Sequence, residues 1–181
     1  MIVAAGNTFL SLLWNPASRP TPNPDTGQPV LHCKSRIEVL IDERSKRDDV
    51  VLIPTPCLAE LLCAVPDLEK AVNTISSSIA FKVAPFDARA AIDLAQAIRK
   101  AKNDGSKHSD SAAGWQKVKF DRQIAAIAKA NGAEIFYTDD NNQTRFAEML
   151  DMKVVHTWDL DLPTKYAQQD FLDEGHEQPE D

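Results

Sequence analysis

The sequence predicts an α/β protein, an α/β/α sandwich built on a Rossmann-like parallel sheet of about five strands. Short apolar runs of strand length alternate along the chain with longer stretches in which apolar residues recur every three or four positions. The short runs are almost continuously apolar, which is typical of strands covered on both faces of a parallel sheet. Strict alternation of strands and helices indicates a sheet flanked by helices.

Five apolar runs are expected to form the sheet. They lie at residues 1–5, 50–53, 81–84, 133–137 and 153–156. Helices are expected after residues 7 and 55 and over about 31–46, 67–79, 87–102, 121–131 and 143–150. Each proposed strand is therefore followed by at least one helical stretch or by the end of the domain, as parallel strands require.

Local signals mark several helix ends. Asn7 begins the first helix as a capping residue, and Thr55 with Pro56 is suited to the N-cap and first turn of another. Asp121 is expected to open the helix before the fourth strand, and Asn131-Gly132 to close it. The inward face of that helix is expected to consist of Ile124, Ala125, Ile127 and Ala128.

Charge and proline are unevenly distributed. The chain of 181 residues has a net charge of −7, and residues 159–181 contain eight acidic residues against one lysine. We therefore expect one domain over 1–158, with a proline-rich loop insertion at 15–30, and an acidic flexible tail over 159–181. Because the negative charge belongs to the tail, it does not exclude a nucleic-acid substrate.

The three cysteines favour a reducing compartment. Their number is odd and no Cys-x-x-Cys motif occurs, so Cys33, Cys57 and Cys63 are expected as buried thiols in a cytoplasmic protein. The apolar start of the chain, residues 1–14, is too short to span a bilayer, and no other segment is a candidate, so no membrane association is expected.

Three carboxylates are expected to meet at the carboxyl edge of the sheet. Glu60 is the only ionisable residue of a stretch, 57–65, that is apolar on every side, so we expect it to be buried. Asp121 precedes the fourth strand and Asp140 follows it. Clustered carboxylates repel one another unless a cation is present, and oxygen ligands suit Mg²⁺ or Mn²⁺.

Each of these acids also has an ordinary structural role open to it. Glu60 can pair with Arg122 or lie at an exposed edge of its helix, and Asp121 can simply stabilise a helix start. Asp139 and Asp140 can cap the following helix. A second site role is open to Asp139, as a further metal ligand beside Asp140.

Three blocks resemble the PIN-domain family. They are Ile-Pro-Thr-Pro-Cys-Leu-Ala-Glu at 53–60, Lys-Phe-Asp-Arg-Gln-Ile-Ala-Ala-Ile-Ala at 119–128 and Tyr-Thr-Asp-Asp at 137–140. The resemblance covers roughly 1–156. It implies a Mg²⁺- or Mn²⁺-dependent ribonuclease, often the toxin of a toxin–antitoxin module, with Glu60, Asp121 and Asp140 as catalytic metal ligands.

The first strand departs from the family pattern. The family has an acidic residue at its end, where this chain reads Ala4-Ala5-Gly6-Asn7-Thr8. Ala5 or Gly6 occupies the position of the missing acid, depending on the register. The expected activity is therefore an endoribonuclease that is impaired as written.

The resemblance and the local charge also suggest partners. RNA contacts are expected from five residues, Asn7, Thr138, Lys117, Lys119 and Arg122. Residues 99–119, which include the two lysines, carry an excess of basic side chains that could line a path for phosphates. The family likeness implies a cognate antitoxin protein and a homodimer. The alternative is a PIN-like module that binds RNA or protein without cleavage, and a different phosphohydrolase is disfavoured because no Gly-rich phosphate loop occurs.

Overall fold

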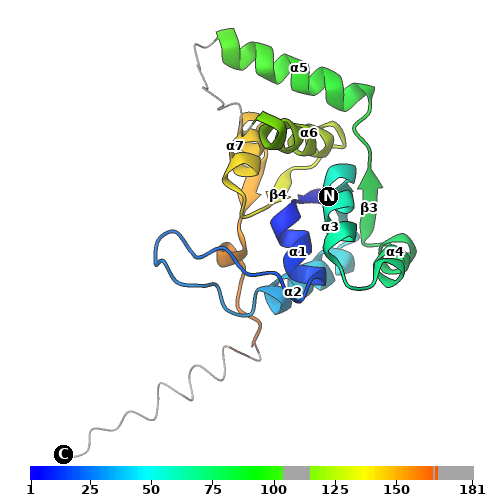
Figure 1. Ribbon diagram of the computed structural model, residues 1–181, viewed down its shortest axis with the longest axis vertical. Helices are drawn as coiled ribbons and strands as arrows, with labels where there is room; N and C mark the ends of the chain where they lie inside the picture. Colours follow the sequence, from blue (N-terminus) through cyan, green and yellow to red (C-terminus); the bar gives the residue numbers. More distant parts are fainter. Residues whose placement is uncertain (104–114, 165, 167–181) are drawn as a thin grey trace, which may run out of the picture.

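A five-stranded parallel sheet forms the centre of the protein. The computed structural model describes residues 1–103, 115–164 and 166 (Figure 1). The strands are β1 (Ile2–Ala5), β2 (Val50–Pro54), β3 (Phe81–Ala84), β4 (Ile135–Tyr137) and β5 (Lys153–Val155). All of the pairings are parallel, in the order β3-β2-β1-β4-β5. The predicted α/β fold and its five strands are confirmed.

Helices flank the sheet in two groups. Their bounds are α1 (Asn7–Trp14), α2 (Cys33–Lys46), α3 (Thr55–Ala64), α4 (Leu68–Ser77), α5 (Ala88–Asn103), α6 (Trp115–Ala130) and α7 (Asn141–Met149), with a 3-10 turn, η1, at Thr157–Asp159. Helix α1 packs against α2 and α3, whereas α6 packs against α5 and α7. The fold that the PIN resemblance implies, a parallel sheet flanked by helices, is the fold observed.

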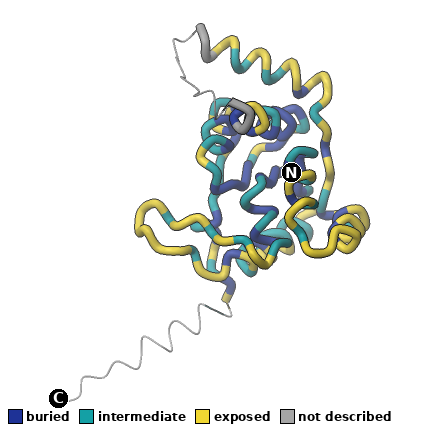
Figure 2. Tube along the Cα trace, viewed as in Figure 1, coloured by how far each residue is buried: buried dark blue, intermediate teal, exposed yellow. Residues whose placement is uncertain are grey.

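The buried core follows the central strands and helix α6. Figure 2 shows the buried segments gathered around the sheet, with the exposed residues on the outer helices and loops. The predicted inward face of α6 is confirmed, because Ile124, Ala125, Ile127 and Ala128 are each 0% exposed. Burial of this face fixes the rotation of α6 and so fixes where its polar residues point.

The strand order reverses at one place on the sheet. Successive connections run outward in both directions from the central pair β1 and β4, so the order reverses between these two strands. In open α/β sheets, ligands bind outside the carboxyl ends of the strands at such a switch point. Gly6 follows β1 there and donates its N–H to the carbonyl of Tyr137 at 2.8 Å.

Three predicted helix starts are wrong. Asn7 is already helical in α1, whose N-cap is Gly6, so Asn7 does not cap that helix. Helix α6 begins at Trp115, so Asp121 lies within the helix rather than at its start. Residues 115–120 contain no Gly or Pro, and nothing in them breaks the helix that the apolar pattern extends. In α3 the N-cap is Pro54, and Thr55 is already helical, because the fixed φ of Pro56 continues the helical turn.

The proline-rich loop and the tail have different outcomes. Residues 15–30 form an extended excursion closed by an antiparallel bridge between Pro22 and Pro29. Gly27, at φ +68°, makes the turn between these two prolines. In the tail, residues 165 and 167–181 lie outside the described part, so its flexibility stays a prediction. Across the described residues, no helix is long and apolar enough to cross a membrane.

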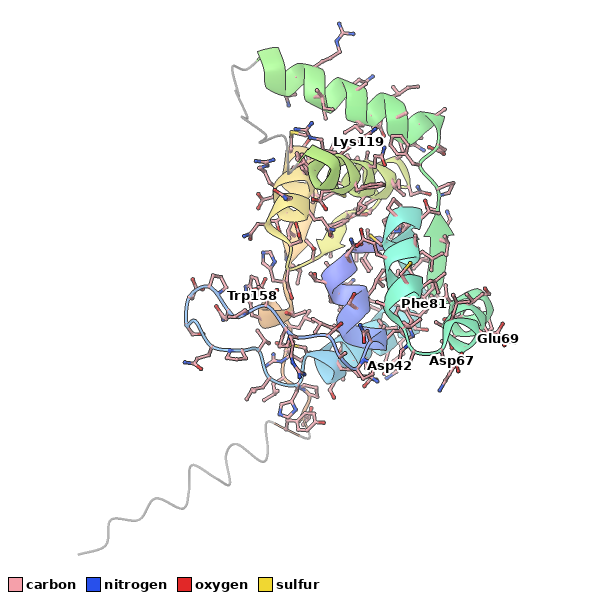
Figure 3. All side chains as sticks on the ribbon, viewed as in Figure 1. Asp42, Asp67, Glu69, Phe81, Lys119 and Trp158 are labelled. Carbon is pink, nitrogen blue, oxygen red and sulfur yellow. The ribbon has the colours of Figure 1, made fainter. Side chains whose placement is uncertain are left out.

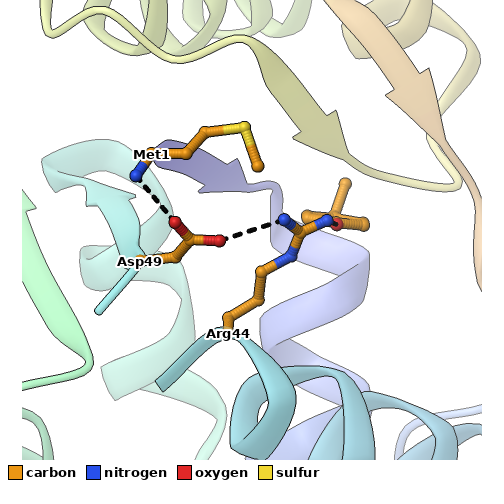
Figure 4. Close-up of polar contacts among 4 residues, drawn as sticks. Met1, Arg44 and Asp49 are labelled. Atoms are coloured by element: carbon orange, nitrogen blue, oxygen red, sulfur yellow. Dashed lines mark hydrogen bonds and ion pairs between the residues drawn. The ribbon is translucent and has the colours of Figure 1, made fainter. Parts of the chain in front are cut away.

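A network of charges lies at the amino end of the sheet. The Met1 ammonium group donates to Asp49 Oδ1 at 2.7 Å, and Arg44 donates to Asp49 Oδ2 at 3.1 Å (Figure 4). Arg44 also donates to the Tyr137 hydroxyl at 3.0 Å. The Asp49 side chain is buried, and two cationic groups therefore compensate its charge.

Candidate functional site at the carboxyl edge

Residues from four segments meet at the carboxyl edge of the sheet, beside β1 and β4. Gly6 and Asn7 follow β1, and Thr138 to Asp140 follow β4. Helix α6 contributes Asp121, which is 2% exposed. Helix α3 contributes Glu60. The predicted site residues thus come from the elements that converge at this edge of the sheet.

Glu60 lies at the open side of the site. It accepts a hydrogen bond from the Asn7 side-chain amide, which ties α3 to the start of α1. The prediction that Glu60 is buried is wrong, since the residue is exposed. Helix α3 directs Cys57 and Leu61 into the core, and Glu60 projects from the other side of the same turn. Asn7 Oδ1 is buried and has no hydrogen-bond partner among the described residues.

The charges of this site affect the pKa of the Cys57 thiol. Cys57 is fully buried on α3. Its pKa is raised well above the ordinary value of 9.0, first by burial and then by the negative charges of Glu60 and Asp121. Both carboxylates therefore act on one buried point, which places α3 and α6 around a shared negative region.

Asp121 is held by a chain of hydrogen bonds that reaches Asp140. The Asp140 N–H donates to Thr138 Oγ1 at 3.1 Å, and Thr138 Oγ1 donates to Gln143 Oε1 at 3.0 Å. Gln143 Nε2 in turn donates to Asp121 Oδ1 at 3.3 Å. Thr138 is 0% exposed and Gln143 is 1% exposed, so the chain runs through the interior.

Asp140 also has a structural role. Its Oδ1 accepts from the N–H groups of Asn142 and Gln143, at 2.8 and 3.1 Å, and so caps α7. The capping alternative considered for Asp140 is therefore observed, and the cap fixes the first turn of α7. That turn carries Gln143 into the site.

The Asp139 carboxylate points to η1. Its two oxygens accept from the N–H and the hydroxyl of Thr157, at 2.8 and 2.6 Å. Burial raises the pKa of Asp139 above the ordinary value of 3.8, although the two bonds from Thr157 act in the opposite direction. The expectation that Asp139 assists in metal binding is wrong, because both oxygens serve to attach η1 to the end of β4.

Position 6 faces the same hydrogen-bond chain. A Cβ atom placed on Gly6 would lie 2.3 Å from Gln143 Oε1 and 2.9 Å from Thr138 Oγ1. Ala5, by contrast, is a strand residue in register with Tyr137 and is 0% exposed. The geometry therefore favours Gly6 over Ala5 as the position of the acid that the resemblance expects.

The described residues do not fit a divalent cation. Within residues 1–103, 115–164 and 166, no group of three or more His, Cys, Asp and Glu is placed to hold one. At Asp121, the Gln143 side-chain amide donates to Oδ1 at 3.3 Å. The predicted metal set of Glu60, Asp121, Asp140 and Asp139 is thus not assembled around one point.

Gln143 is the residue that the sequence analysis missed. It lies in α7 in phase with Phe146 and Ala147, which are both buried. A signal was available, because a polar residue three and four positions before apolar ones faces the core. Such a residue is expected to bond to a buried partner, and Gln143 does so on both sides.

The basic residues expected to bind RNA belong to helix α6. Lys119 is exposed on α6, at the place labelled in Figure 3. Arg122 lies over the Phe146 ring, with 5.1 Å between its Cζ and the ring centroid. The side chain of Lys117 lies outside the described part of the structure, as do residues 104–114. Of the expected phosphate path, Lys119 and Arg122 are the side chains placed here.

The thiols and a cavity complete the description. Cys33 and Cys57 are buried as expected, but Cys63 is exposed, because α3 turns that side toward solvent. A cavity of about 800 Å³ lies at the far end of α1, between α2, α4 and the start of β3. Asp42, Asp67 and Phe81 line it and are labelled in Figure 3.

Solved structures that are similar to this chain include two VapBC complexes. VapBC2 from Rickettsia felis, bound to a DNA fragment from its promoter, is 15% identical, with a TM-score of 0.49 over 86% of this chain and 98% of that one. DNA-bound VapBC from Salmonella typhimurium is 16% identical, with a TM-score of 0.48 over 87% and 99%. No family model and no curated protein sequence matches the chain.

Proposed function

We propose that this chain is a PIN-type endoribonuclease, the toxin of a toxin–antitoxin module, whose RNA-cleaving activity is impaired as the sequence stands. The supporting observation is the arrangement at the switch point of the sheet. Three polar residues lie near this edge, namely Asn7, Glu60 and Asp121. Position 6 carries no side chain. The site retains negative charge at a ligand-binding edge but lacks the acid of the first strand.

The proposed cofactor is Mg²⁺ or Mn²⁺, bound weakly. Oxygen donors from Glu60 and Asp121 are of the type these ions prefer, and such ions supply charge stabilisation at a scissile phosphate. Losing a carboxylate that holds the ion is expected to slow cleavage by about a thousandfold or more. The proposed substrate is single-stranded RNA.

A cleavage assay tests the proposed activity. Labelled single-stranded RNA is incubated with Mn²⁺, with and without chelator. The proteins are the chain as given and the variants Gly6→Asp/Gln143→Ala and Gly6→Asp/Gln143→Ala/Glu60→Gln, in which Gln143→Ala makes room beside position 6. We expect cleavage by the chain as given to be at or near background. Gly6→Asp/Gln143→Ala should raise chelator-sensitive cleavage, and adding Glu60→Gln should abolish the gain. Robust chelator-sensitive cleavage by the unmodified chain would show that position 6 is not needed.

A second candidate function is a non-cleaving module that binds RNA or a protein. The closure of position 6 by Gln143 favours it, because the interior of the site is already filled. An antitoxin-type partner and a homodimer are the proposed protein contacts. The cavity at the end of α1 offers apolar surface from Leu13, Trp14 and Phe81 for such a contact.

Binding without cleavage distinguishes the two candidates. RNA affinity is measured by fluorescence anisotropy with chelator present, for the chain as given and for Lys119→Ala. Micromolar binding that weakens in Lys119→Ala, with no cleavage by any position-6 variant, would favour the binding module. Absence of RNA binding in every condition would remove RNA from both proposals.

A further inference from the structure

The Gln143 side chain occupies the place that an acid at position 6 would need. Its Oε1 atom lies where a Cβ on residue 6 would approach to 2.3 Å, far inside ordinary contact. The amide is fully enclosed, at 1% exposure, and bonds at both ends, to Thr138 and to Asp121. The Gln143 amide therefore fills the space that a side chain at position 6 would need.

The hydrogen-bond chain through Gln143 has only one possible direction. The Asp140 N–H can only donate, so Thr138 Oγ1 accepts from it and gives its own proton to Gln143 Oε1. The Gln143 amide nitrogen must then donate, and Asp121 Oδ1 accepts as a carboxylate. A neutral amide thus solvates one oxygen of a buried anion, which is one of the tasks a bound cation would perform.

We propose, resting on the function proposed above, that Gln143 is a positioning residue that keeps this site closed to divalent cations. Its amide replaces the cation at Asp121, and its volume replaces the acid at position 6. Opening the site takes a change at residue 143, and a new acid at position 6 alone is not sufficient.

An isosteric substitution gives the first test. Gln143→Glu keeps the shape of the side chain but places a second carboxylate about 3.3 Å from Asp121 Oδ1. Two carboxylates at such a distance cannot both stay ionised without a proton or a cation. Mn²⁺ binding is measured by isothermal titration calorimetry, and Tm is measured in EDTA and in Mn²⁺. Gln96→Glu, on the exposed side of α5, adds the same charge away from the site as the matched control.

We expect Gln143→Glu to bind Mn²⁺ about tenfold or more tightly than either the unmodified chain or Gln96→Glu. In EDTA its Tm should fall by about 3 °C or more at pH 7 and recover on adding Mn²⁺. The loss should also recover as the pH is lowered toward 5, because the folded pair then binds a proton that the unfolded chain does not. Equal Mn²⁺ affinity in Gln143→Glu and Gln96→Glu would overturn the proposal.

A second pair of variants addresses the space at position 6 and does not depend on folding of Gln143→Glu. Gly6→Asp alone should lower Tm in EDTA, since its side chain meets Gln143, and should gain little Mn²⁺ affinity. Gly6→Asp/Gln143→Ala should regain Tm and bind Mn²⁺ about tenfold more tightly than Gly6→Asp. Mn²⁺ affinity in Gly6→Asp equal to that of the double variant would show that Gln143 is not the barrier.

These readouts separate this proposal from the proposed activity. Mn²⁺ affinity and Tm decide the role of Gln143 whether or not any variant cleaves RNA. If the double variant binds Mn²⁺ tightly and leaves RNA intact, the ribonuclease proposal fails and the role of Gln143 stands. If it cleaves RNA but binds Mn²⁺ no better than Gly6→Asp, the role of Gln143 fails.

Discussion

The two ends of the sheet hold carboxylates in different ways. At the amino end, Asp49 accepts from the Met1 ammonium group and from Arg44, both of which are cationic. At the carboxyl edge, Asp121 accepts from the Gln143 amide and Glu60 from the Asn7 amide. At the first end the donors are cationic groups, whereas Gln143 and Asn7 donate to Asp121 and Glu60 through neutral amides.

The difference indicates that the amino end of the sheet contributes more to the stability of the fold. A buried carboxylate between two cations favours the ionised folded state, and removing a partner leaves an uncompensated charge. At the carboxyl edge, burial raises the pKa of the Cys57 thiol most, and the negative charges of Glu60 and Asp121 raise it further. Perturbed pKa values of this kind are typical of functional sites.

The largest effect is expected from Arg44→Ala at the amino end. This change leaves Asp49 with one cation fewer and leaves the buried Tyr137 hydroxyl without its donor. We expect a loss of about 2 kcal/mol in the free energy of unfolding, or a fall in Tm of about 4–8 °C. Thermal unfolding followed by circular dichroism measures it, with the exposed Arg47→Ala as control. Equal Tm values for the two variants would contradict the assignment.

The pH dependence of Asp49 gives a smaller effect at the same end. Its pKa is lowered below 3.8, first by the hydrogen bond from the Met1 ammonium group and then by that from Arg44. The resulting stabilisation is present above pH 3.8 and is lost as the pH falls through the lowered pKa. The Tm difference between the chain and Asp49→Asn should therefore be largest near pH 6 and close below about pH 3.8. A difference that is constant from pH 7 to 3 would disprove this linkage.

A still smaller change is expected from Glu60→Gln at the carboxyl edge. Glu60 is exposed, and the substitution keeps an oxygen that can accept from Asn7. Tm should therefore change by about 1 °C or less. The same thermal melts measure it beside Arg44→Ala, and a fall of comparable size in the two variants would erase the contrast between the ends.

The smallest effect concerns thiol reactivity at the carboxyl edge. One cysteine, the exposed Cys63, should react rapidly with a thiol reagent, while Cys33 and Cys57 react slowly. Glu60→Gln removes one of the charges that raise the Cys57 pKa, so labelling of Cys57 should quicken by about twofold or less. Mass spectrometry of timed samples assigns the sites, with Cys63→Ser removing the fast phase. Slower labelling of Cys57 in Glu60→Gln would contradict this effect.

Much of the fold could be predicted from the sequence because its signals are local. The five strands follow from short, almost continuous apolar runs, and the inward face of α6 follows from an apolar period near 3.6. Helix starts were less predictable, because the start of α6 depends on continuation through residues 115–120 and not on a capping residue. The position of Glu60 was also missed, since an apolar helix packed on one side leaves its other side exposed.

The site was predictable in its elements but not in its connections. Residue type and strand-end position were enough to bring Glu60, Asp121 and Asp140 to one edge. Which carboxylate turns inward was not, because Asp139 is committed to Thr157, a partner 18 positions away. The role of Gln143 likewise depends on contacts to residues from two other segments, and its residue type alone does not reveal it.

The packing of Gly6 against Gln143 has a consequence for how the gene can change. Every glycine codon is a single base away from a codon for an acidic residue, and every glutamine codon is a single base away from glutamate. Mutational distance therefore does not protect the closed state. If Gln143 has the role proposed above, the order of changes matters. The Cβ of an acid that arises first at position 6 would come within 2.3 Å of Gln143 Oε1, so that amide would have to move. A single change at position 6 would then leave the site closed, whereas a change at residue 143 would make room for the acid.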